Sequence, residues 1–142
     1  MDLPITHKVL IYGLGPRGLL VFAEPDFPEI ALQVPGGSIE AGEAPEAAAT
    51  REWVEETGLP AGPMQALGIW DSRGDFGHGP RHYRRHYFHL PLSGDLPATW
   101  DHHEKSPSSG GPPILFRFFW LPVGTARARL GYGQAEALDR LN

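Results

Sequence analysis

Short runs of apolar and β-branched residues recur along the chain between turn-forming residues. Residues 7–12 and 18–24 are two such runs, and the sequence GLGP after the first one predicts a β-hairpin. Further runs of this kind predict four more strands, at residues 30–36, 64–71, 84–92 and 113–122. This pattern predicts a protein built mainly from a sheet.

Two segments have the features of helices. Pro45 stands where the first helical turn accepts proline, and Gly58 stands where a helix end favours glycine, so residues 46–57 should form a helix of about three turns. A second, shorter helix is expected over residues 133–141. Strands before and after the longer helix predict an α/β (α+β) fold with a mixed sheet.

Composition limits the class of protein. A chain of 142 residues fits one domain, so we expect residues 1–142 to form a single domain. The absence of cysteine excludes thiolate chemistry and agrees with a reducing compartment, so a cytoplasmic location is expected. No apolar run is long enough to cross a membrane, and the formal charge of −5 makes nucleic acid an unlikely partner. A homodimer remains open.

One glycine pattern suggests a nucleotide site that its context contradicts. Gly13, Gly15 and Gly18 match G-x-G-x-x-G after an apolar run. In a dinucleotide-binding fold the last glycine opens a helix, whereas here an apolar, β-branched run follows and Pro16 lies within the turn. A hairpin turn is therefore the better interpretation.

The predicted helix at residues 46–57 carries unusually dense negative charge. Six glutamates and one arginine lie between residues 40 and 56. At about 100° per residue, Glu52, Glu55 and Glu56 share one face of the helix, where like charges repel. Hard divalent cations such as Mg²⁺ prefer oxygen ligands, so this face is a candidate metal site. The ordinary alternative is an acidic face in contact with solvent.

The spacing of these residues matches a family motif. From Gly37 to Leu59 the chain reads G-x5-E-x7-R-E-U-x-E-E-x-G-U, where U is a bulky apolar residue. This pattern is the Nudix box, and the sequence resembles the Nudix hydrolases. The resemblance implies a mixed sheet sandwiched between helices.

The resemblance also assigns roles to individual residues. It implies that Glu52 and Glu56 bind Mg²⁺ or Mn²⁺, that Glu55 assists them, and that the backbone carbonyl of Gly36 is a further metal ligand. The structural members of the box are Gly37, Glu43, Arg51 and Gly58. Arg51 and Glu43 are expected to join the acidic loop to the helix by charge-assisted hydrogen bonds.

The activity implied by the resemblance is hydrolysis of a nucleoside diphosphate linked to another group X (NDP-X), with water attacking phosphorus. The general base varies within the family, so the catalytic candidates are Glu55 and Glu56 in the box and Glu104 beyond it. Asp101 is the next candidate after Glu104. For Glu104, an acid on a flexible surface loop is the ordinary alternative.

Three residues are candidates for substrate contacts. Arg84 could hold phosphate oxygens, and Tyr87 or Trp100 could stack on a base. The ordinary alternative for residues 84–92 is a half-buried strand with a polar face, because the sequence does not fix its orientation. ADP-ribose hydrolases tend to have a proline where this chain has Gly74, and dinucleoside polyphosphate hydrolases tend to have a tyrosine where it has Phe76. Neither substrate is therefore indicated.

Two other functions are alternatives to hydrolysis. A Nudix-fold module could bind a nucleotide metabolite without cleaving it, but such modules often lose box carboxylates and this chain has them all. An isomerase of the isopentenyl diphosphate type relies on a cysteine, and the chain has none. Hydrolysis is the function that the sequence favours.

Overall fold

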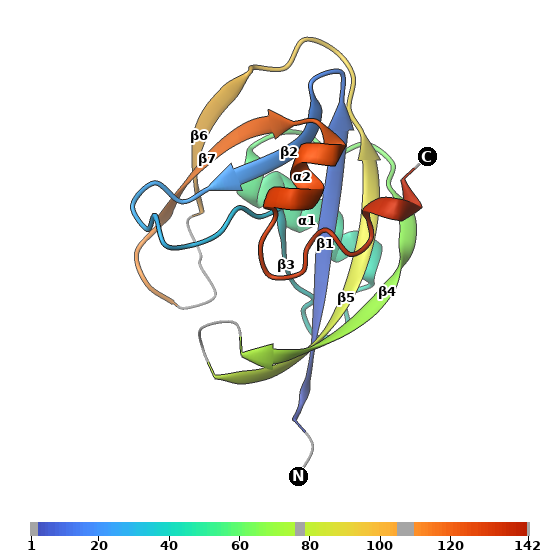
Figure 1. Ribbon diagram of the computed structural model, residues 1–142. Helices are drawn as coiled ribbons and strands as arrows, with labels where there is room; N and C mark the ends of the chain where they lie inside the picture. Colours follow the sequence, from blue (N-terminus) through green and yellow to red (C-terminus); the bar gives the residue numbers. More distant parts are fainter. Residues whose placement is uncertain (1–2, 76–78, 105–109, 142) are drawn as a thin grey trace.

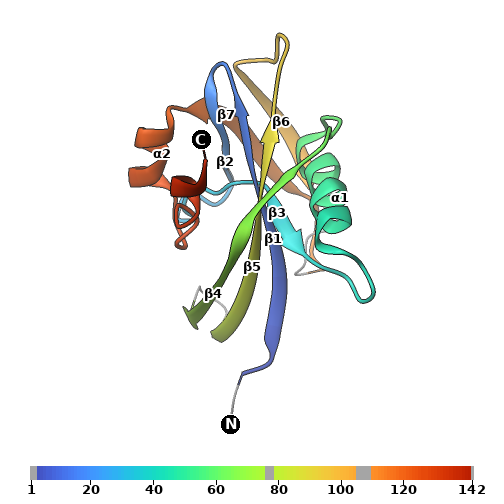
Figure 2. The ribbon, with the colours of Figure 1, turned by 90° about the vertical axis from the view of Figure 1, so that its right-hand side faces the viewer.

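A seven-stranded sheet runs through the centre of the molecule, and Figure 2 shows one helix on each side of it. The structure is a computed structural model that describes residues 3–75, 79–104 and 110–141. The strands are β1 (Ile5–Gly15), β2 (Gly18–Ala23), β3 (Gly36–Ser38), β4 (Gln65–Asp75), β5 (Pro80–Pro91), β6 (Thr99–Glu104) and β7 (Ile114–Leu121). The helices are α1 (Pro45–Thr57), α2 (Val123–Arg129) and the 3₁₀ turn η1 (Leu138–Arg140). None of these helices is long and apolar enough to cross a membrane.

The sheet is mixed, as predicted. Its strand order is β4-β5-β1-β2-β7-β6, with β3 paired to β1 off this path, and Figure 1 shows β1 and β5 side by side at its centre. β1 and β5 are parallel, and every other pairing between named strands is antiparallel. The predicted α+β sandwich is therefore confirmed.

β1 changes its partner along one edge. Its other edge pairs with β5 over residues 5–14. On the remaining edge, Leu14 and Gly15 pair with β2, whereas residues 8–10 pair with β3. β2 and β3 thus follow one another along the same edge of β1, and the sheet opens between them.

Alternating side chains of β1 supply two cores. Val9 and Ile11 pack with α1 on one face, and Leu10 and Tyr12 pack with α2 on the other. The largest buried side chain of α1, Trp53, is fully enclosed in the first core. The helix is therefore fixed to the sheet by Trp53 and its buried alanines, and Glu52 and Glu56 are also among its buried residues.

The glycine pattern belongs to a hairpin, as predicted. A Cβ atom on Gly13 would lie 2.5 Å from a ring carbon of Trp53, so this glycine makes room for that side chain. Gly18 has φ +111°, in the region that favours glycine, and follows the turn between β1 and β2. These glycines therefore serve packing and a turn.

The predictions for residues 30–36 and 133–141 are wrong in detail. Residues 30–36 do not form a regular strand, because Gln33 bridges to Phe22 while Leu32 bridges to Leu130, so no single partner strand continues. Residues 133–141 form turns ending in η1, because Gly133 and the preceding Tyr132 both have positive φ. A helix does form nearby, at α2.

Two elements have weak signals in the sequence. β6 has the polar sequence TWDHHE, which contains no apolar run, yet it pairs with β7 along its whole length. The short helix α2 has no side-chain N-cap and contains a glycine. Both elements are selected by packing and pairing with distant parts of the chain.

Candidate metal and active site

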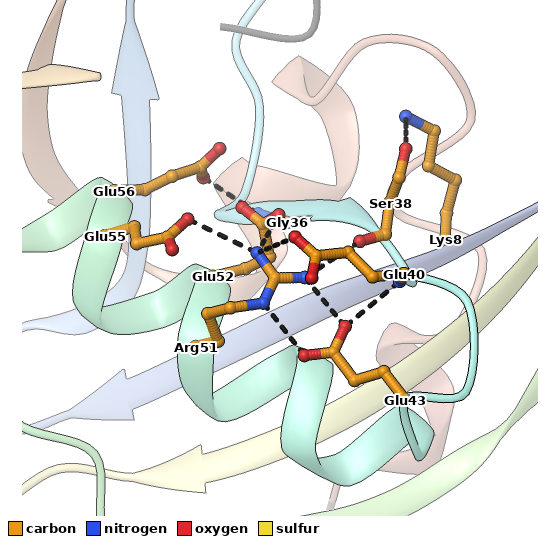
Figure 3. A network of polar contacts seen from close by, with 9 residues as sticks. All are labelled: Lys8, Gly36, Ser38, Glu40, Glu43, Arg51, Glu52, Glu55 and Glu56. Carbon is orange, nitrogen blue, oxygen red and sulfur yellow. Dashed lines mark hydrogen bonds and ion pairs between the residues drawn. The ribbon is translucent and has the colours of Figure 1, made fainter. Parts of the chain in front are cut away.

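The C-terminal half of α1 lies against β3, which brings the carboxylates of the box to the backbone of Gly36 and Gly37 (Figure 3). Gly36 N donates a hydrogen bond of 2.9 Å to Glu56 Oε1. A Cβ atom on Gly37 would lie 2.2 Å from the carboxyl carbon of Glu52, so only glycine permits this approach. The close contact of strand and helix encloses Glu52 and Glu56, which are only 9% and 5% exposed.

Arg51 occupies the centre of a polar network between the helix and the loop before it (Figure 3). It binds Glu43 in bidentate fashion, through Nε at 2.9 Å and Nη2 at 2.8 Å. It also donates to Ser38 O at 3.1 Å, to Glu52 at 3.0 Å and to Glu55 at 3.3 Å. Such charge-assisted bonds hold the loop, β3 and α1 in register.

The enclosed carboxylates are poorly hydrated and repel one another. Burial raises the pKa of Glu52, and burial together with the charge of Glu104 raises the pKa of Glu56 well above its usual value. Burial, followed by the charge of Glu52, raises the pKa of Glu104 to about 7. The charged forms of these groups are therefore destabilised in the absence of a cation.

Glu104 reaches this cluster from the end of β6. The alternation of the strand places Trp100, His102 and Glu104 on one side. Trp100 Nε1 donates to Thr57 O at 3.0 Å, and His102 Nε2 hydrogen-bonds Glu55 O at 3.0 Å, so this side of β6 faces α1. Glu104 therefore lies on a paired strand, and the alternative of a flexible surface loop is wrong.

Asp101 lies on the other side of the same strand. It forms a bidentate ion pair with Arg117, at 2.9 and 3.0 Å. Because neighbouring positions of a strand point to opposite faces, Asp101 and Glu104 do not share a side. Asp101 is therefore the poorer candidate for the base.

The three predicted substrate contacts have partners within the fold. Tyr87 is fully buried, and its hydroxyl donates a 2.5 Å hydrogen bond to Glu136. The prediction that Tyr87 stacks on a base is wrong, because the fold encloses its ring. Arg84 forms two hydrogen bonds with Asp71, at 2.8 and 2.9 Å. Trp100 is half-buried against Phe118 and helps to attach β6 to α1.

Two charged residues near the cluster were not predicted. Lys8 lies on β1, where burial lowers its pKa and the charges of Glu52 and Glu56 oppose this shift. Glu24 follows β2, where burial raises its pKa, and its charge helps to raise the pKa of Glu104. In the sequence, the feature that could have indicated these two residues is a charged side chain within or directly after an apolar run.

The chemistry of the cluster fits a hard divalent cation. Its side-chain donors are carboxylate oxygens beside the backbone of Gly36, and oxygen atoms are the ligands that Mg²⁺ and Mn²⁺ prefer. Within the described ranges, no three acidic, histidine or cysteine side chains are already gathered as a ligand set. Glu52 and Glu55 instead share Arg51, so cation binding would compete with this arginine.

The sequence was also compared with known proteins. The profile of the NUDIX domain family matches residues 6–141, which is almost the whole chain. The chain belongs to the NUDIX domain family. The predictions of a Nudix hydrolase fold and enzyme class are confirmed. No curated protein matches the sequence.

Solved structures share the same Nudix fold. A MutT NUDIX hydrolase from Burkholderia pseudomallei is 17% identical, with a TM-score of 0.70 and coverage of 98% of this chain and 99% of that one. A NUDIX hydrolase from Nitrosomonas europaea is 22% identical, with a TM-score of 0.70 and coverage of 96% and 88%. A protein described as UDP-X diphosphatase is 20% identical, with a TM-score of 0.63 and coverage of 99% and 63%.

Proposed function

We propose that the protein hydrolyses the pyrophosphate linkage of a small-molecule NDP-X substrate, using Mg²⁺ or Mn²⁺. The enclosure of Glu52 and Glu56 against the backbone of Gly36 and Gly37 is the observation that supports this proposal most strongly. Family membership and the name of the UDP-X diphosphatase agree with the substrate class. The residues at the two marker positions, Gly74 and Phe76, favour no particular group X, and Phe76 lies outside the described residues.

In this proposal, Glu52, Glu56 and the carbonyl of Gly36 hold the cation, and Glu55 assists. A bound divalent cation would neutralise the pyrophosphate and lower the pKa of a bound water. Glu52 and Glu56 favour this binding because enclosed carboxylates without a cation bear the cost of desolvation and mutual repulsion. The box glycines and Arg51 position these two side chains.

Glu104 is the proposed general base. A pKa raised to about 7 suits a group that must both be deprotonated and accept a proton near neutral pH. Its carboxylate would take a proton from water as the water oxygen bonds to phosphorus. The bridging P–O bond breaks, and the products are a nucleoside monophosphate and phosphorylated X. Glu55 and Glu56 are the next candidates.

The remaining proposals follow the sequence. We propose that residues 1–142 form one hydrolase domain that acts in the cytoplasm on a small molecule. Neither a membrane nor a nucleic acid is proposed as a partner.

A substrate screen tests the proposed function. Purified protein with Mg²⁺ or Mn²⁺ is incubated with a panel of nucleoside diphosphate derivatives, and phosphate is measured after treatment with a phosphatase. We expect release from at least one derivative, and none when EDTA is added. A module that only binds nucleotides would release no phosphate from any member of the panel, although it would still bind one of them.

A further inference from the structure

Lys8 lies on the part of β1 that pairs with β3. It pairs with Ser38 of β3 on one edge of β1 and with Arg85 of β5 on the other. Alternate residues of a strand point to the same face of the sheet, so Lys8 points to the same face as Leu10 and Tyr12, which pack against α2. The Lys8 side chain is therefore anchored on the α2 face of the sheet, next to the strand that carries Gly36 and Gly37.

The ammonium group of Lys8 is oriented by neutral partners. Its Nζ donates a 3.0 Å hydrogen bond to Ser38 Oγ, while the carbonyl of the same serine accepts from Arg51 (Figure 3). The same atom lies 5.3 Å from the ring centre of Tyr83. Among the described residues, no carboxylate comes within 4.0 Å of Nζ. An ammonium has three N–H donors, so the hydroxyl and the ring orient this group without neutralising its charge.

The other cation beside Tyr83 differs in this respect. Arg85 is buried and donates to Tyr132 O at 2.7 Å and to Glu136 at 3.1 Å, so a carboxylate neutralises it inside the fold. Lys8 is instead close enough to Glu52, Glu56 and Glu104 for their charges to act on it. A lysine that only balanced the acidic cluster would be expected to form an ion pair with it, and Lys8 hydrogen-bonds a hydroxyl instead.

We propose that Lys8 binds a phosphoryl oxygen of the substrate's pyrophosphate. The carboxylate cluster and Lys8 would then hold the pyrophosphate from two sides, with Ser38 and Tyr83 fixing the direction of the ammonium group. This inference rests on the proposed function, since it assumes that a pyrophosphate occupies the site. It assigns a substrate contact to a residue outside the Nudix box.

Binding of methylenediphosphonate tests this contact without knowledge of X. This pyrophosphate analogue has a bridging carbon that cannot be hydrolysed, and its affinity is measured by calorimetry in the presence of Mn²⁺. Removing a hydrogen bond to a charged group should weaken binding about 10- to 100-fold in Lys8→Met. Lys8→Arg should recover most of this loss. Mn²⁺ affinity in Lys8→Met should be unchanged or higher, because a positive charge near the carboxylates has been removed.

Arg17→Met is the matched control. Arg17 is exposed in the turn between β1 and β2, at the other end of β1, and its loss should change neither affinity. A Lys8→Met protein that binds methylenediphosphonate like the wild type would overturn the inference, as would wild-type protein that does not bind it. If the analogue binds as expected but no derivative in the screen is hydrolysed, the proposed function fails and the phosphate contact stands.

Discussion

Replacing Glu104 with glutamine should stabilise the metal-free protein while it removes activity. The carboxylate of Glu104 is half-buried next to other carboxylates, and its pKa is raised from 4.5 to about 7. At 1.36 kcal/mol per pKa unit, this rise corresponds to an upper limit of about 3 kcal/mol. Because the group is partly hydrated, solvent screening reduces the expected gain in unfolding free energy to about 1–2 kcal/mol at pH 8.

The pH dependence has a defined sign. A carboxyl group whose folded-state pKa is raised contributes its full stability below its unfolded pKa, and this stability is lost as pH rises through the folded value of about 7. The advantage of Glu104→Gln should therefore be largest at pH 8 and small at pH 5. Urea unfolding in EDTA at both pH values measures it.

The control for this measurement is Glu46→Gln, which removes an exposed glutamate in the first turn of α1. Its effect should stay within about 0.5 kcal/mol at both pH values. If Glu104→Gln is no more stable than the wild type at pH 8, or gains equally at pH 5, the placement of Glu104 among repelling carboxylates is wrong. In the activity assay, loss of the base should lower kcat by about 10²- to 10⁴-fold with nearly unchanged metal affinity.

Two further predictions concern the metal and the glycines. Mg²⁺ should raise the melting temperature of the wild type while NaCl at equal ionic strength does not, because a bound cation stabilises the folded state beyond screening; equal shifts in a thermal scan would contradict a specific site. Gly37→Ala should reduce Mg²⁺ affinity with little loss of stability, because its Cβ meets the flexible end of the Glu52 side chain. Gly36→Ala should instead lower the free energy of unfolding by about 1–3 kcal/mol, because its Cβ would lie 2.4 Å from the backbone oxygen of Val9. Calorimetry measures the Mg²⁺ affinity of each variant and urea unfolding measures its stability. Similar effects of both variants on both quantities would contradict the different roles assigned to Gly36 and Gly37.

The sequence predicted what local chemistry determines. Pro45 and Gly58 set the limits of α1 closely, since the helix runs from Pro45 to Thr57 and Gly58 has the left-handed conformation expected at its end. The spacing of Glu52, Glu55 and Glu56 follows from the helical period alone. These features do not depend on which distant segments pack against them.

Long-range pairing determines what the sequence did not predict. Glu104 was a candidate by elimination, but its place beside α1 depends on the pairing of β6 with β7 and on the hydrogen bond from Trp100 to Thr57. The choice of Tyr87 was wrong because Tyr12, Trp70 and the C-terminal segment pack around its ring on the α2 face. Lys8 was missed for a similar reason, since β3 lies next to it only in the folded sheet.

The activity of Glu56→Gln tests the central claim, that the enclosed glutamates gather a catalytic cation. Glutamine can still accept the hydrogen bond from Gly36 N, and the change removes a buried charge, so folding should be retained. The measurement is hydrolysis of the substrate identified by the screen, at saturating Mg²⁺, with melting temperature as the control for folding. We predict that Glu56→Gln nearly abolishes hydrolysis at saturating Mg²⁺. Without metal, the variant should be at least as stable as the wild type. A Glu56→Gln enzyme with wild-type turnover would contradict the metal assignment.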